Sequence, residues 1–245
     1  MHNTFLVQHF HWKPRPSRLV TFTNKVLNKL GTSYRIVLPE PMIMSSLEFR
    51  MNLFHMASEA VHGVAGDFVE VGCNAGYSSV ILQKLLKEAG SERALHVYDS
   101  FEGLPAAVHA KDDSAYEAGE MATSLDLFEQ NFRALGLPLP HVHKGWFSDT
   151  LPGTLPERIA FALIDGDLYE STKTALEQVY PRLVPGAVAM FNIYYDGNVY
   201  EPDSRWVKYR SPGVKQATDE FFADKPEKVS VLYSGHYSSG YFRKQ

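Results

Sequence analysis

The chain has 245 residues, enough for one large domain or for one domain with an appendage. Its formal net charge of -4 argues against a general nucleic-acid binder, because such domains are strongly basic. It has one cysteine, Cys73, so an intrachain disulfide and an all-cysteine metal site are excluded, and no apolar run approaches the ~20 residues of a membrane helix. We therefore expect a cytoplasmic protein with no nucleic-acid or membrane partner.

The N-terminal segment differs from the rest of the chain in charge. Residues 1–39 contain six lysines and arginines and no acid, together with Phe10, Trp12, Pro14 and Pro16. A solvated basic tail is one interpretation. The aromatic residues favour another, in which residues 1–45 form an arm that packs on the main domain or on the second subunit of a homodimer.

From residue 46 onward, helical and extended patterns alternate, which predicts one α/β domain over residues 46–245. Helical patterns are expected over 46–61, 77–89, 124–137, 169–183 and 212–226. Extended patterns are expected over 67–71, 94–100, 140–147, 158–167, 187–193, 228–235 and 239–245. Ser46 can cap the first helix, and the Pro185-Gly186 pair is predicted to turn the chain before the strand at 187–193.

The central strands are apolar on both faces, which is typical of a parallel sheet covered by helices on two sides. The whole pattern predicts a Rossmann-like, doubly wound, mostly parallel seven-stranded sheet with an N-terminal arm. In such sheets, ligands bind beyond the carboxyl ends of the strands. Four predicted strands end in the polar residues Glu70, Asp99, Asp165 and Asn192, so we expect a site at that edge.

The first strand runs into a glycine turn, GDFVEVGCNAG, at residues 66–76. Gly72 and Gly76 allow a ligand to approach the backbone, and the helix that follows offers free N–H groups to a diphosphate or a carboxylate. Asn74 stands where a dinucleotide fingerprint would have another glycine, and the Glu-x-Gly-x-x-x-Gly spacing is used by many S-adenosylmethionine enzymes. A second interpretation is that this glycine turn has a structural role only and binds no ligand. Asp99 lies 23 residues after Gly76, a position suited to binding the ribose hydroxyls of either NAD or S-adenosylmethionine.

Three further stretches carry a family resemblance: DSFEGLP (99–105), GWFSDTLP (145–152) and IDGDLYEST (164–172). Together with the glycine turn they resemble the macrocin O-methyltransferase (TylF-like) family of class I S-adenosylmethionine-dependent methyltransferases. Enzymes of this family methylate hydroxyls on the sugars of antibiotics and related natural products. The resemblance covers roughly residues 46–245 apart from one inserted loop, and it implies a methyltransferase of natural-product biosynthesis with a small-molecule acceptor.

The resemblance also implies where the cofactor S-adenosylmethionine binds. Glu70, Gly72 and Gly76 would line its methionine end, and Asp99 would bind its ribose. The other residues expected at the cofactor lie in or just after the strand ends: Asn74, Tyr77, Ser78, Ser100, Phe101, Trp146, Phe147, Ser148 and Asp165. Within that set, Ser100 and Phe101 are expected beside the adenosine, and the stretch from Trp146 to Ser148 near the adenine.

For catalysis, the resemblance implies that Asp165 is the first metal-binding carboxylate and that Asp167 is the general base. A sugar hydroxyl has a pKa far above 7; a divalent metal lowers this pKa, and a carboxylate accepts the proton. His109, in the loop after DSFEGLP, is an alternative base, as is His236 near the closing strands.

The sequence departs from the family at its fifth strand, where Asn192 and Ile193 stand in place of two adjacent aspartates. Asp165 and Asn192 remain as metal ligands, and we expect weak Mg²⁺ binding or none. Asp196 is an alternative ligand, and Tyr194 or Tyr195 could act on the substrate instead. The inserted loop at 197–211 is predicted to form a lid over the acceptor.

Four interpretations are therefore compared. The first is an O-methyltransferase with a degenerate metal site, acting on a hydroxyl of a small natural product. The second is a metal-independent methyltransferase acting on a phenol, enol or amine. The third is a cofactor-binding protein that catalyses another reaction, such as cyclisation. The fourth, a nicotinamide dehydrogenase, is disfavoured by Asn74 and by the DSFEGLP loop.

Overall fold

The structure of the protein is a computed structural model, which describes residues 17–34, 36, 45–110, 112, 116–195, 211–235 and 237–245. The chain divides into two compact units, Met1–Ser45 and Ser46–Gln245. In the first unit, helix α2 (Arg18–Lys29) begins after Ser17, whose hydroxyl accepts a hydrogen bond from the N–H of Val20. No helix within the described ranges is long and apolar enough to cross a membrane.

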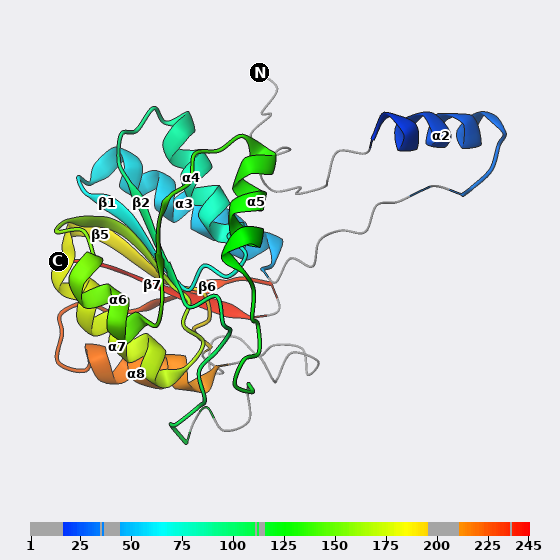
Figure 1. The fold of residues 1–245 in the computed structure, drawn as a ribbon. Helices are drawn as coiled ribbons and strands as arrows, with labels where there is room; N and C mark the ends of the chain where they lie inside the picture. The colour runs from blue at the N-terminus through cyan, green and yellow to red at the C-terminus, as the bar shows by residue number, and fades with distance from the viewer. Residues whose placement is uncertain are drawn as a thin grey trace. The chain divides into compact units, whose positions relative to one another are not determined.

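The second unit contains a seven-stranded sheet in the order β3-β2-β1-β4-β5-β7-β6 (Figure 1). Its strands are β1 (Asp67–Val71), β2 (Leu95–Asp99), β3 (His141–Lys144), β4 (Ile159–Ile164), β5 (Leu183–Phe191), β6 (Ser230–Tyr233) and β7 (Ser238–Arg243). β7 pairs antiparallel with both β5 and β6, and the strands from β1 to β5 pair with one another in parallel. The predicted mostly parallel, doubly wound sheet is therefore confirmed.

Helices cover the two faces of this sheet, as Figure 1 shows. One face carries α3 (Leu47–Gly63), α4 (Tyr77–Glu88) and α5 (Leu125–Leu135). The other carries α6 (Phe147–Thr154), α7 (Tyr169–Val179), which continues as the short helix η1 (Tyr180–Arg182), and α8 (Pro212–Phe222). Ser46 caps α3 as predicted, because its hydroxyl accepts from the N–H of Phe49 at 3.0 Å.

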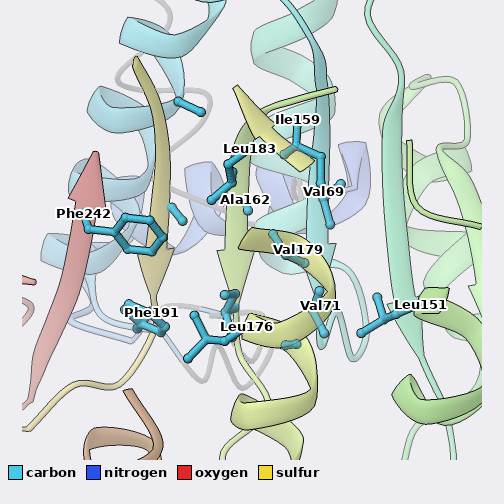
Figure 2. Packing of buried hydrophobic residues seen from close by; sticks show 14 of the residues in the cluster. Val69, Val71, Leu151, Ile159, Ala162, Leu176, Val179, Leu183, Phe191 and Phe242 are labelled. Carbon is cyan, nitrogen blue, oxygen red and sulfur yellow. The ribbon is translucent and has the colours of Figure 1, made fainter. Parts of the chain in front are cut away.

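One layer of the core lies between the sheet and α7. All six residues of β4 are buried, as expected for a central parallel strand. In Figure 2, Val69 and Val71 of β1 lie near Val179 of α7 among the buried side chains of this layer. Because side chains alternate along a strand, Glu70 points to the opposite face, toward α4. Full burial of one such apolar side chain contributes about 1.5–3 kcal/mol.

Two expectations about local structure were wrong. Pro185 and Gly186 lie inside β5 rather than before it. Leu183 pairs with Ile159 and Val188 with Phe161, so five steps along β5 oppose two along β4, and the Pro-Gly pair forms a bulge rather than a turn.

The second error concerns GWFSDTLP, for which no helix was expected. Its residues from Phe147 onward form the start of α6, with Pro152 inside the helix. The helix has only eight residues, too few for a periodic pattern to be recognised.

Candidate functional site

The carboxyl ends of five strands form one continuous edge. Beyond each strand, the next backbone N–H still bonds to the neighbouring strand: Gly72 to Tyr98 O at 2.8 Å, Asp165 to Val71 O at 2.8 Å, and Asn192 to Ile164 O at 3.1 Å. Gly145 extends the row by donating to the carbonyl of Asp99 at 2.9 Å. The predicted gathering of polar residues at this edge is therefore present in the structure.

Both glycines of the turn are required by close packing. Gly72 has φ +92°, and a Cβ there would lie 2.0 Å from the carbonyl oxygen of Asp165. Gly76 has φ +86°, and a Cβ there would lie 2.8 Å from the ring of Phe128 in α5. Gly76 also precedes α4, and as a glycine it offers no side-chain cap to the start of that helix.

Asp99 ties this turn to the loop that follows β2. Its Oδ2 accepts from the N–H groups of Cys73 at 3.0 Å and Asn74 at 2.8 Å, and its Oδ1 accepts from Phe101 at 2.7 Å. A carboxylate accepts about four hydrogen bonds, so one position is left for a ligand hydroxyl. Asn74 in turn donates from its amide to the carbonyl of Met121 at 2.7 Å, which attaches the loop before α5 to the turn.

Glu70 is fully buried beneath the start of α4, where its carboxyl group accepts from the hydroxyls of Ser78 and Ser79. Burial raises the pKa of Glu70 to about 8, although the two serine hydroxyls oppose this shift. Two predicted cofactor residues, Glu70 and Ser78, thus contact each other. Tyr77 is the half-buried first residue of α4. Their contact with a cofactor stays a prediction.

The residues expected at the adenosine differ in their surroundings: some pack against the protein and others lie at the surface. Ser100 donates to Gly103 O at 3.1 Å, and the ring of Phe101 packs edge-on against Phe128 with centroids 5.9 Å apart, so both face the protein. Trp146 follows Gly145 and is 38% exposed, which leaves its ring available to a ligand near Asp99. Phe147 packs against the core.

Ser148 is exposed and donates to Asp149 at 3.2 Å. Of the adenine stretch, Trp146 therefore has the surface position that the prediction needs.

At the other end of the edge, Asp165 is held by an amide. The Nδ2 atom of Asn192 donates to both carboxylate oxygens of Asp165, at 2.9 and 2.8 Å. The Asn192 Oδ1 atom accepts from the hydroxyl of Tyr237 at 3.2 Å. Burial raises the pKa of Asp165, and the amide partly opposes this shift. The sequence carried no signal for Tyr237.

Asp167 lies two residues further along the chain, with φ +58°. The hydroxyl of Tyr116 is 3.5 Å from its Oδ1 atom and 3.0 Å from the Oγ of Ser211, which precedes α8. Burial, and then the charge of Asp165, raise the pKa of Asp167. Tyr116 was also missed by the sequence analysis, because the loop that carries it has no periodic pattern.

The alternative bases are placed as follows. His109 stacks on the ring of Tyr169, the first residue of α7, with centroids 3.8 Å apart. Asp112 of the same loop accepts from the Tyr169 N–H at 2.9 Å, so the loop is attached to α7. His109 as a base stays a prediction, and His236 lies outside the described residues.

Tyr194, proposed above as a residue acting on substrate, is 5% exposed, and its hydroxyl donates to Asp219 of α8. This contact points to an anchoring role for its side chain. Tyr195 is half-buried.

The described residues do not fit a divalent cation as they are placed. Magnesium prefers oxygen ligands, but both oxygens of Asp165 face the Asn192 amide nitrogen. The side chain of Ile193 has no oxygen atom that could bind a metal. In the part of the chain that the structure describes, no group of three or more His, Cys, Asp or Glu residues is arranged to hold a metal. Asp196 and residues 197–210 of the predicted lid lie outside that part.

The sheet order and the polar strand-end edge define the fold of class I methyltransferases. The solved structure of the O-methyltransferase NovP is similar to this chain, with a TM-score of 0.68 and 26% identity over 81% of this chain and 80% of that one. A family model described as "Macrocin-O-methyltransferase (TylF)" matches residues 40–211. The chain therefore belongs to the macrocin O-methyltransferase family, as its motifs predicted.

Two curated relatives are named as O-methyltransferases. An 8-demethyl-8-(2,3-dimethoxy-α-L-rhamnosyl)-tetracenomycin-C 4′-O-methyltransferase of Streptomyces olivaceus is 42% identical over 141 residues, 54% of each chain. The mycinamicin III 3″-O-methyltransferase of Micromonospora griseorubida is 36% identical over 155 residues, 58% of this chain and 61% of that protein. The chain thus matches little more than half the length of these relatives.

Proposed function

We propose that the protein is an S-adenosylmethionine-dependent O-methyltransferase acting on a hydroxyl of a small natural product. The observation that carries this proposal is the shared edge at which Asp99 ends β2 and Asp165 and Asp167 follow β4, with β1 between these two strands, in a chain of the macrocin O-methyltransferase family. The names of both curated relatives specify methylation on a hydroxyl, and one specifies a rhamnosyl compound. A sugar hydroxyl of a glycosylated natural product is therefore the acceptor class that we favour.

The residues at the edge fit S-adenosylmethionine. Asp99 has one acceptor position left for a ribose hydroxyl, and the positive dipole end at the start of α4 favours a carboxylate. The cofactor supplies a methyl group on a positively charged sulfur, and the carboxyl groups of Asp165 and Asp167 favour a cation at this edge. Trp146 provides an exposed aromatic face for the adenine.

Asp167 would accept the proton of the acceptor hydroxyl. Its pKa is raised by burial, which makes it a stronger base than an exposed aspartate. Burial and the charge of Asp167 raise the pKa of Tyr116, so this hydroxyl stays protonated and can orient the carboxylate of Asp167. Asp165, held by Asn192, would contribute negative charge at a fixed place beside Asp167 and would not accept the proton itself.

We further propose that this chain works with a degenerate metal site. The support is the Asn192 amide nitrogen, which faces both oxygens of Asp165. In addition, the side chain of Ile193 has no atom that could bind a metal. With no metal to lower the pKa of the acceptor hydroxyl, Asp167 would have to remove a proton from a weaker acid. The same observation favours a second candidate, a metal-independent methyltransferase whose acceptor is a phenol, an enol or an amine.

The test is an assay with S-adenosylmethionine and two acceptors that the relatives' names specify, mycinamicin III and the rhamnosylated tetracenomycin, with catechol as a third. Reactions run in EDTA and in Mg²⁺, and mass spectrometry detects S-adenosylhomocysteine and the methylated product. We expect product in EDTA, lost in Asp167→Asn while calorimetry still detects S-adenosylhomocysteine binding.

Failure of folded protein to bind S-adenosylhomocysteine would contradict the cofactor assignment. Activity that disappears in EDTA and returns with Mg²⁺ would contradict the degenerate metal site. Methylation of catechol alone would favour the second candidate.

We also propose that the arm at residues 1–45 joins two copies of the chain. The side chains of Leu19 and Phe22 in α2 and of Leu30, its C-terminal cap, are each at least 65% exposed, and the helical period places them on one side. Residues 1–39 contain six of the 24 basic residues and none of the 28 acidic ones, so the remainder is strongly acidic. This charge difference favours the acidic domain of a second copy as the partner of the arm.

A further inference from the structure

The segment that begins β7 holds the end of β5 through four hydrogen bonds. Ser239 Oγ donates to the carbonyl of Asn192 at 2.6 Å, and the Tyr237 hydroxyl donates to its Oδ1 at 3.2 Å. Ser238 accepts from the N–H of Tyr194 at 2.8 Å and donates from its hydroxyl to the Tyr194 carbonyl at 2.7 Å. The backbone and the side chain of Asn192 are therefore both positioned by residues more than 40 positions away.

These bonds determine which way the Asn192 amide faces. The NH₂ group of Asn192 faces Asp165, where it donates to both carboxyl oxygens. The amide oxygen then faces Tyr237, whose hydroxyl satisfies it. Tyr237 is half-buried and lies beside Phe49 of α3, with ring centroids 6.4 Å apart, which restricts its own movement. The result is a chain of contacts from Tyr237 through Asn192 to Asp165.

We propose that Tyr237 is a positioning residue for methyl transfer, because it holds the Asn192 amide that orients the Asp165 carboxylate at the catalytic edge. The expected effect on kcat rests on the proposed function. The expected effect on the orientation of the Asn192 amide does not. In a metal-bound site, a cation would orient such a carboxylate; here the tyrosine and the amide take over that task.

The test is a double-mutant cycle on Tyr237 and Asn192, with Tyr241→Phe as a matched control on β7. Tyr237→Phe removes the hydrogen bond to Asn192 Oδ1 and the contact of the same hydroxyl with Ser46, so we expect kcat to fall about five- to tenfold with little change in S-adenosylhomocysteine affinity. In Asn192→Ala, the further change Tyr237→Phe should have no effect on kcat, whereas Tyr241→Phe should be neutral in both backgrounds. Equal losses from Tyr237→Phe in both backgrounds would overturn the inference.

A second measurement does not depend on finding the acceptor. The side-chain N–H signals of Asn192, assigned in NMR spectra by their loss in Asn192→Ala, report its contact with Asp165. We expect hydrogen exchange at these groups to accelerate about tenfold in Tyr237→Phe and to stay unchanged in Tyr241→Phe. Unchanged exchange in Tyr237→Phe would refute the positioning role, and absence of turnover in the wild type would refute only the proposed function.

Discussion

Replacing Glu70 by Gln should change how the stability of the protein depends on pH. Glu70 is fully buried, and burial raises its pKa from the ordinary value of 4.5 to about 8. The folded state therefore binds more protons than the unfolded state between these values, so the free energy of unfolding falls as the pH rises from about 4.5 to about 8. With 1.36 kcal/mol for each pKa unit, this loss is about 5 kcal/mol at most.

Gln is uncharged at every pH and has nearly the same shape as Glu, so Glu70→Gln should not show this loss. We expect the variant to be less stable than or equal to the wild type at pH 5 and more stable at pH 9. Urea denaturation of both proteins at pH 5, 7 and 9 measures the difference, with exposed Glu92→Gln as a control. A difference in unfolding free energy that stays constant from pH 5 to 9 would refute the reasoning.

Three further predictions concern the ligands and the arm. Asp99→Asn removes an ionised acceptor shared by the glycine turn and the predicted ribose site, so S-adenosylhomocysteine affinity measured by calorimetry should fall about ten- to a hundredfold; an unchanged affinity would place the ribose elsewhere. Asn192→Asp combined with Ile193→Asp supplies two carboxylates beside Asp165, so Mn²⁺ binding should appear in the variant; equally tight binding by the wild type would contradict the degenerate site. Phe22→Ser with Val26→Ser should turn a dimer into a monomer in sedimentation experiments, and a wild-type monomer would contradict the proposed role of the arm.

The strand pattern and the positions of the acids were readable from the sequence. Buried parallel strands need continuous apolar runs, and parallel strands bring their carboxyl ends to one edge, so the gathering of Asp99, Asp165 and Asn192 followed from local patterns. Ser46 was recognisable as a cap because the interaction spans three residues. The bulge at Pro185 and Gly186 was not, since its register depends on β4.

The chemical state of the site depends on contacts that only the tertiary structure creates. Tyr237 reaches Asn192 across 45 positions of sequence, and Asn192 reaches Asp165 across 27. No spacing rule links such residues, because the sheet order that places β7 beside β5 is a property of the whole fold. Gly76 is similar: the turn was evident in the sequence, but its contact with Phe128 comes from the packing of α5. The sequence by itself determined which groups reach the edge, and the tertiary structure decided which of them face one another.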